Sequence, residues 1–368
     1  MKILITNHHL QAYCGTEIFT YTIARALKNR NHDLYVYSPY LGGISKEIIA
    51  LGIPVVNDLR SLDKDFDVAH VHHNILAYEV RNRFPELPII FFSHGVKPYL
   101  EQPPPTEIGI VKYMAVSEEV KDSLINLGVF ESKIGTFRNP VNENTFFPKK
   151  PINVTPKKAL VISNYIDNIT EKIIRNACSK LSIDLRFVGA RFEIMPNDKI
   201  SEVINEVDIV ITLGRGAIES MFCGRIPIII DRWVGDGMVT PKNFSDLIQS
   251  NFSGRYHGHK YTVSELCTEI KKYQQKYSEE LRQLALEEFS VTSQTDKLLK
   301  IYEECLGMNV PEINKANKRI ISFFCKAIDR TRNSTQNITR KEIISEIGGF
   351  RPYKMYRLLG KFRKLINK

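Results

Sequence analysis

Residues 209–230 read IVITLGRGAIESMFCGRIPIII, and this stretch indicates the fold of the second half of the chain. Its two ends, residues 209–211 and 226–230, are apolar runs of the kind found in strands that are buried on both faces of a parallel sheet. The segment between them, residues 217–223, has helical spacing and follows two glycines. A strand, a glycine-rich turn, a helix and a second strand together predict one βαβ unit.

The same alternation of apolar strands and helical segments recurs along the rest of the chain. A Pro-, Lys- and Asn-rich join at residues 139–158 separates two such series. We therefore predict an α/β protein with two doubly wound, Rossmann-like domains that face each other across a cleft, residues 1–150 and 151–308. The other predicted strands are residues 2–5, 34–37, 68–71, 89–92, 113–116, 159–162 and 184–188.

The remaining residues, 309–368, form a basic extension that we predict to be helical. They hold 15 Lys and Arg against 4 Asp and Glu, whereas residues 1–308 hold 36 against 37, so the extension accounts for the formal net charge of +10. Residues 312–329 and 353–368 both have the spacing of amphipathic helices. In the second of these, an apolar stripe is flanked by lysines and arginines; the stripe contains Met355, Leu359, Phe362 and Ile366.

A basic amphipathic helix at residues 353–368 suits the anionic inner face of a membrane. The alternative is a helix docked on the body with its lysines in solvent, and the pattern does not separate the two. Nucleic-acid binding ranks third, because no aromatic platform accompanies the charge. The body lacks a spanning apolar segment and the start lacks a signal-peptide pattern, so we expect a cytoplasmic protein, with peripheral membrane attachment as the further possibility.

The sequence predicts no metal site and no bound cofactor. The six cysteines never form a C-x-x-C pair, and the histidine group at His70, His72 and His73 has no carboxylate or cysteine beside it. His94, at the end of a predicted strand, is instead favoured as a residue of the cleft.

The predicted ligand site lies where strands end and helices begin. Gly214 and Gly216 allow a backbone nest at a helix N-terminus, Arg215 adds charged donors, and Glu219 stands in the first turns of that helix. Such a group can hold a diphosphate and the hydroxyls of a ribose; the alternative assigns the glycines to the turn, Arg215 to solvent and Glu219 to the helix dipole. At the first strand-to-helix junction, Gly15 and Thr16 offer a second close approach for an anion, or simply a tight turn.

The order of these segments over about residues 1–308 resembles GT-B-fold glycosyltransferases, most closely the nucleotide-sugar-dependent enzymes of glycosyltransferase family 4. Residues 31–36 are similar to the family's G-H-x-V stretch, residues 139–142 to its N-G-V-D, and residues 214–227 to its donor-binding helix, E-A-x-A-x-G-x-P-V-I. Ser93-His94-Gly95 also fits. The resemblance implies that Glu219 binds the donor ribose, Gly15 approaches the donor phosphates and His94 lines the donor sugar.

Two positions depart from the family pattern. The family places a second Glu eight residues before the one that matches Glu219, and Ile211 stands there. The Arg and Lys that usually neutralise the diphosphate have no match in residues 163–167. Arg215, or Arg191 after Gly189, is the candidate substitute, so we include Gly189 and Arg191 in the predicted donor site.

The resulting hypothesis is a metal-independent glycosyltransferase that moves a sugar from a nucleotide diphosphate sugar to an acceptor hydroxyl in surface glycan synthesis. The acceptor would be a glycan or a lipid-linked sugar, and the resemblance implies retention of anomeric configuration. Two alternatives stay open. One is another GT-B reaction on a nucleotide sugar, such as epimerisation, and the other is a degenerate, non-catalytic scaffold.

Overall fold

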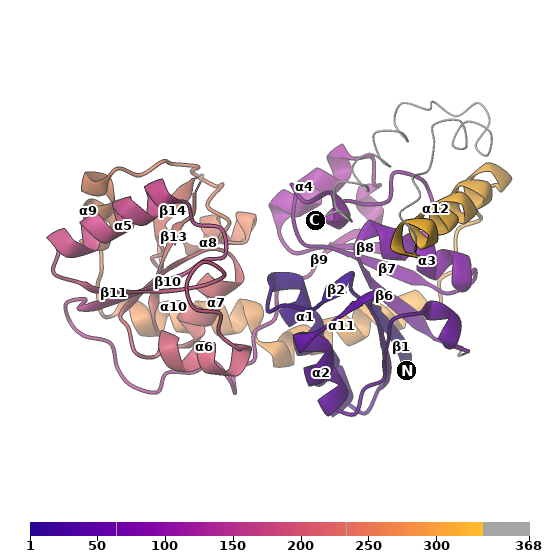
Figure 1. The fold of residues 1–368 in the computed structure, drawn as a ribbon, viewed down its shortest axis with the longest axis horizontal. Coiled ribbons are helices and arrows are strands. Elements are labelled where there is room, and N and C mark those ends of the chain that lie inside the picture. Colours follow the sequence, from indigo (N-terminus) through magenta and orange to yellow (C-terminus); the bar gives the residue numbers. More distant parts are fainter. Residues whose placement is uncertain (64, 233, 334–368) are drawn as a thin grey trace.

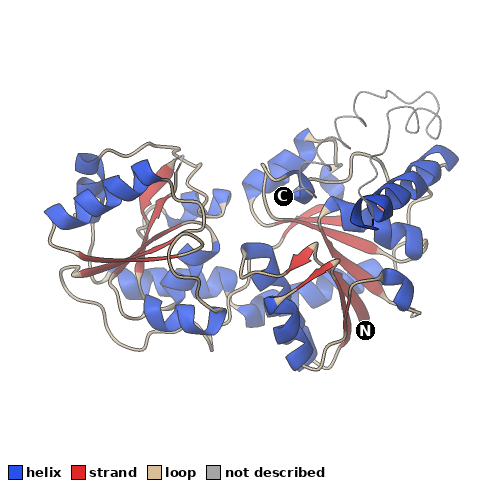
Figure 2. Cartoon of the chain, viewed as in Figure 1, coloured by secondary structure: helices blue, strands red, loops and turns tan. Residues whose placement is uncertain are grey.

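The computed structural model describes residues 1–63, 65–232 and 234–333. They form two α/β lobes, each a sheet covered by helices on both faces (Figures 1 and 2). The first lobe contains residues 1–140 together with 291–333, and the second contains residues 142–289. The predicted fold class is therefore confirmed.

The sheet of the first lobe has seven strands in the order β5-β3-β1-β6-β7-β8-β9, all parallel. A separate two-stranded pair, β2 (His9–Leu10) and β4 (Tyr40–Leu41), lies beside it. The strands are β1 (Lys2–Thr6), β3 (Asp33–Tyr37), β5 (Val55–Val56), β6 (Val68–His72), β7 (Ile89–Ser93), β8 (Ile110–Ala115) and β9 (Ile134–Thr136). The helices between them are α1 (Gly15–Asn29), α2 (Gly43–Ala50), α3 (Asn74–Arg83) and α4 (Glu118–Asn126).

The sheet of the second lobe has five strands in the order β11-β10-β12-β13-β14, and β14 is antiparallel to its neighbour. The sequence pattern did not predict β14, because its glycines hide the strand character. The strands are β10 (Lys158–Ile162), β11 (Asp184–Val188), β12 (Ile209–Thr212), β13 (Ile226–Ile230) and β14 (Gly235–Met238). The helices are α5 (Asn168–Lys180), α6 (Asn197–Ile204), α7 (Arg215–Phe222), α8 (Phe244–Leu247), α9 (Val263–Ile270) and α10 (Tyr277–Phe289).

Helix α11 (Val291–Leu306) returns to the first lobe, which differs from the predicted boundary at residue 308. Its buried side chains, Leu298, Tyr302 and Cys305, belong to the same apolar cluster as β1 and α1. Where the chain crosses back, Val141 and Ser290 form a β-bridge: the Val141 N–H donates to the Phe289 carbonyl at 2.8 Å. The two connections between the lobes, at residues 141 and 290, therefore lie side by side.

Helix α12 (Lys315–Asn333) contains the first part of the basic extension, and it lies along α3 (Figure 1). Its apolar side, which includes Ile320, Phe324 and Ile328, is buried in the core of the first lobe. The Arg332 guanidinium also pairs with the Glu79 carboxylate on α3, at 2.5 and 3.0 Å. This part of the extension is therefore docked on the body, while the helix predicted at residues 353–368 lies outside the described residues. Within those described, no helix has the length and apolar character that crossing a membrane requires.

Candidate functional site

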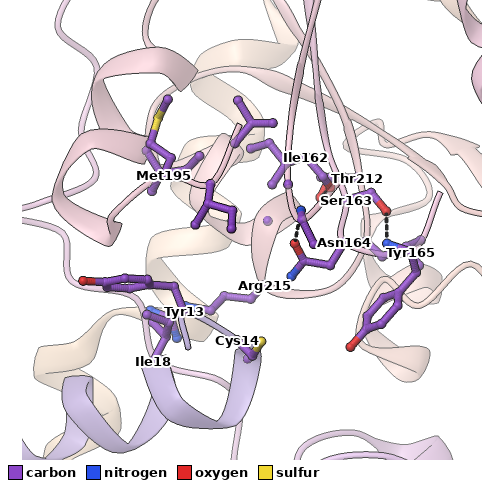
Figure 3. Close-up of a pocket in the computed structure, with 18 of the residues that line it drawn as sticks. Tyr13, Cys14, Ile18, Ile162, Ser163, Asn164, Tyr165, Met195, Thr212 and Arg215 are labelled. Carbon is purple, nitrogen blue, oxygen red and sulfur yellow. Dashed lines mark hydrogen bonds between the residues drawn. The ribbon is translucent and has the colours of Figure 1, made fainter. Parts of the chain in front are cut away.

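A cavity of about 570 Å³ lies between the two lobes, at the carboxyl ends of β10, β11 and β12. The start of α1 closes it from the first lobe, where Tyr13, Cys14 and Ile18 face the loops of the second lobe (Figure 3). Ligands of open parallel sheets bind at this edge. Of the predicted site residues, five line the cavity: Gly15, Gly189, Arg215, Gly216 and Glu219.

Gly189 forms the wall where the loops after β10 and β11 meet. Its φ of +141° is a conformation that side chains rarely adopt, and a Cβ at this position would lie 1.9 Å from the Ser163 carbonyl oxygen. Just beyond it, the Ala190 N–H donates to Asn164 Oδ1 at 3.0 Å. The glycine is required because two backbone segments touch here.

The glycines at the start of α7 are explained in part by packing. Gly214 has a φ of +54°, and its N–H already donates to the Phe252 carbonyl at 2.8 Å. A Cβ on Gly216 would lie 2.4 Å from Thr212 Oγ1. The Gly216 N–H also donates, to the Leu213 carbonyl at 3.2 Å, so the predicted nest loses the N–H groups of both glycines.

Arg215 and Glu219 form a buried ion pair, with Arg215 Nε 2.6 Å from Glu219 Oε1. Arg215 also donates to the Pro140 carbonyl at 2.9 Å and to Thr22 Oγ1 at 3.3 Å, so it connects the second lobe to the first. Burial raises the pKa of Glu219, and the adjacent guanidinium opposes that shift. Glu219 Oε2 has no hydrogen-bond partner among the residues that the structure describes, which leaves it available to a ligand in the cavity.

The start of α1 faces the same cavity from the first lobe. The space around Gly15 is open, since a Cβ there would meet no atom within 4 Å, and the N-cap residue Cys14 makes no side-chain cap. The free N–H groups of a helix start favour an anion. Thr16 does not line the cavity; its hydroxyl donates to Glu17 Oε2 at 2.9 Å, so its part in the predicted site is limited to its backbone.

Arg191 lies outside the cavity, contrary to its expected place in the donor site. Its guanidinium donates to the Ile166 carbonyl at 2.5 Å and to Asn168 Oδ1 at 2.6 Å, at the start of α5. Arg191 follows Gly189 by two residues, and the turn at Gly189 directs the Arg191 side chain away from the cleft. Arg215 is therefore the only one of the two candidate substitutes that reaches the cavity.

His94 lines a second cavity, of about 260 Å³, which shares Leu213 with the first. Its Nε2 is 2.7 Å from His72 Nδ1, and the Phe19 ring packs edge-on against it. Burial lowers the pKa of His94 to about 4, so the imidazole is neutral at pH 7. Gly214 lines this cavity from the opposite lobe.

Several residues of the two cavities were missed by the sequence analysis. Asn164 and Asp231 line the first cavity, and Glu101, Ser253 and Arg255 line the second. The place of Glu101, seven residues after His94 at the end of a predicted strand, could have marked it as a cleft residue. Ser253 and Arg255 follow an irregular turn that no strand or helix pattern locates.

In the N-terminal part of the chain, residues 13–145 match the model of Glycosyltransferase Family 4. The predicted family resemblance is thereby confirmed. No curated protein sequence matches this chain.

Solved structures of low sequence identity share the GT-B fold of this chain. HepE of Anabaena, in complex with UDP and glucose, has a TM-score of 0.62 at 12% identity, over 83% of this chain and 100% of its own. AviGT4, a glycosyltransferase of avilamycin A biosynthesis, has 0.57 at 14% identity, over 84% and 99%. A putative UDP-N-acetylglucosamine 2-epimerase of Listeria monocytogenes has 0.54 at 10% identity, over 85% and 99%.

Proposed function

We propose that this protein is a glycosyltransferase that transfers a sugar from a nucleoside diphosphate donor to an acceptor hydroxyl, with the donor bound in the cavity between the lobes. The observation that supports it best is the buried pair of Arg215 and Glu219, which places a charged donor and a free carboxylate oxygen in a cavity of about 570 Å³. Structures of HepE, similar in fold, hold UDP and UDP-glucose.

Each part of the cavity suits one part of such a donor. Glu219 Oε2 would accept hydrogen bonds from ribose hydroxyls, while the helix starts at Gly15 and Arg215 face the diphosphate. As the bond to the sugar breaks, negative charge grows on the leaving phosphate, and these N–H groups with Arg215 would stabilise it. His94 lies one cavity further, where the transferred sugar would sit.

The finer features of the reaction follow from the family resemblance. We propose that the enzyme needs no catalytic metal, retains the anomeric configuration, and uses a glycan or lipid-linked acceptor in surface glycan synthesis. Attachment to an anionic membrane, through residues 353–368, and a cytoplasmic location belong to the same proposal.

A thermal-shift screen tests the proposal and separates it from its alternatives. UDP, GDP, UDP-glucose, UDP-galactose and GDP-mannose are the ligands, and one present at 100 times its Kd stabilises the chain by about 2.7 kcal/mol. A scaffold that has lost its site would bind none of them. An epimerase-like enzyme would convert the donor without an acceptor, which product analysis detects.

Removing either member of the buried pair should weaken nucleotide binding. We expect Arg215→Ala and Glu219→Ala each to lose on the order of 1.5–3 kcal/mol of affinity for the tightest nucleoside diphosphate, measured by calorimetry. Glu219→Gln keeps the shape of the side chain and removes its charge, so this variant tests the carboxylate if the alanine variants unfold. The matched control is the exposed pair of Arg186 and Glu206 in the same lobe, whose alanine variants should bind as wild type does. Unchanged affinity in the Arg215 and Glu219 variants would contradict this site.

His94→Ala should lower turnover and leave stability almost unchanged. The side chain lies beside the expected place of the sugar, so its loss should reduce kcat by about 10–100-fold. This is below the roughly 10²–10⁴-fold of a full acid–base role, because an imidazole with a pKa of about 4 is a weak base at pH 7. The melting temperature should stay within a few degrees. His257→Ala, an exposed histidine of the second lobe, is the control. Normal turnover with a large loss of stability would assign His94 to packing alone.

A further inference from the structure

The second cavity contains the carboxylate of Glu101, which has no hydrogen-bond or ion-pair partner within residues 1–63, 65–232 and 234–333. Glu101 ends the short 3-10 helix that follows β7, and its carbonyl accepts a hydrogen bond from Ser93 Oγ at 2.6 Å, which fixes the segment beside His94. The carboxylate rests against Gly95, where a Cβ would lie 2.6 Å from Glu101 Oε2. In the described part of the chain, no side chain or N–H forms a hydrogen bond or ion pair with this carboxylate.

The charged groups around Glu101 do not neutralise it. Arg255 lines the same cavity, but its guanidinium is held by both oxygens of Glu119 on α4, at 2.7 Å each. Burial and, to a lesser extent, the nearby Glu17 carboxylate raise the pKa of Glu101 to about 7, although Arg255 acts in the opposite direction. Lys97 and the neutral imidazole of His94 also line the cavity. Glu101 therefore exchanges its proton near neutral pH.

A second polar group in the cavity is also unpaired. Ser253 Oγ is buried and has no hydrogen-bond partner among the described residues. It lies on the wall contributed by the second lobe, whereas Glu101 lies on the wall of the first. Buried polar groups are nearly always hydrogen-bonded, so the buried Ser253 Oγ, opposite a half-buried carboxylate in the same cavity, points to a ligand that supplies both donors and acceptors. Hydroxyl groups do both.

The size and place of the cavity narrow the ligand further. Its volume of about 260 Å³ lies below the roughly 300–1,000 Å³ of pockets for drug-sized ligands, so it suits one sugar ring better than a nucleotide. It adjoins the larger cavity at Leu213 and the start of α7, where a diphosphate would lie.

We propose that Glu101 accepts hydrogen bonds from hydroxyl groups of the transferred sugar and thereby selects the donor sugar, with Ser253 as its counterpart on the opposite wall. This inference rests on the proposed function. The first lobe would then supply the carboxylate that contacts the sugar. At the position where the family has its second Glu, this chain has the buried Ile211.

Calorimetry can separate contacts with the sugar from contacts with the nucleotide. Wild type, Glu101→Gln and the control Glu131→Gln, an exposed carboxylate of the same lobe, are titrated with UDP, UDP-glucose, GDP and GDP-mannose. We expect Glu101→Gln to bind the nucleoside diphosphates normally and to bind the matching nucleotide sugar 10–100-fold more weakly, because a charge-assisted hydrogen bond is lost. Glu131→Gln should match wild type. Glu101→Asp should recover part of the loss.

The pH dependence and deoxy sugars give two readouts that a structural role would not change. The ionised carboxylate is the stronger acceptor, so in wild type the preference for nucleotide sugar over nucleoside diphosphate should grow from pH 6 to pH 8, and Glu101→Gln should show no such change. Among nucleotide sugars that lack one hydroxyl, at least one should bind wild type 10–100-fold more weakly than the complete nucleotide sugar does. Removal of that hydroxyl should cause no further loss of affinity for Glu101→Gln.

Two outcomes would overturn the inference, and they are distinguishable. If wild type binds none of the four ligands, the proposed function fails and this inference falls with it. If wild type binds them but Glu101→Gln weakens nucleotide and nucleotide sugar equally, or neither, only the role of Glu101 is wrong.

Discussion

Gly189→Ala is expected to destabilise the second lobe by about 3–5 kcal/mol and to abolish nucleotide binding. The new Cβ would lie 1.9 Å from the Ser163 carbonyl oxygen, and the φ of +141° adds strain for any residue but glycine. The loops after β10 and β11 must then separate, and these loops form a wall of the larger cavity. Thermal unfolding should show a fall in melting temperature on the order of 10 °C.

Gly15→Ala is the matched control for this effect. Gly15 also lines the cavity, but a Cβ there meets no atom within 4 Å and the residue begins a helix, so its stability should equal that of wild type. Equal melting temperatures for Gly189→Ala and Gly15→Ala would show that the two loops are not held in contact.

Phe324→Ala is expected to cost about 3–5 kcal/mol of stability, the range for buried phenylalanines. Phe324 is fully buried on α12, and its ring stacks on Tyr78 with 4.9 Å between centroids. Its loss should lower the urea midpoint and open α12 to trypsin, which cleaves after Lys326 and Arg330. Both changes are expected because the first part of the basic extension completes the core of the first lobe.

The control for this variant is Phe130→Ala in the same lobe. Phe130 is 74% exposed, so its truncation removes the same atoms without opening a cavity. Its free energy of unfolding, measured with urea, should stay within about 0.5 kcal/mol of wild type. A Phe324 variant as stable as the Phe130 variant would mean that α12 is not needed by the core.

The two-lobed fold could be predicted from the sequence because its strands are short, continuous apolar runs. Ile226–Ile230 illustrates this: all five residues are buried, and no helix of that length would bury every side. Helix α11 was assigned to the wrong lobe for a related reason. Its pattern of apolar residues predicts a helix, but a periodic stripe does not state which of two sheets it covers.

The candidate site was predictable where the glycine-rich turn at the start of α7 marks it, and Arg215, Gly216 and Glu219 all line the cavity. Gly189 was included because it precedes Arg191, and the structure shows that close backbone contact requires glycine there. The direction of a long side chain was not predictable, and Arg191 therefore proved to lie outside the cavity. Glu101 was missed because its environment is built by residues far apart in the sequence, including Ser253 and Arg255.

The β-bridge between Val141 and Ser290 makes the second lobe an insertion within the first. The two ends of residues 142–289 are hydrogen-bonded neighbours, so the lobe is attached as a single module at one point of its host. A graft of this module into a related enzyme needs both joints, whereas a fusion at residue 150 alone would leave α11 and α12 without their partners. Nucleotide preference should transfer with the module, because most residues that line the larger cavity belong to the second lobe.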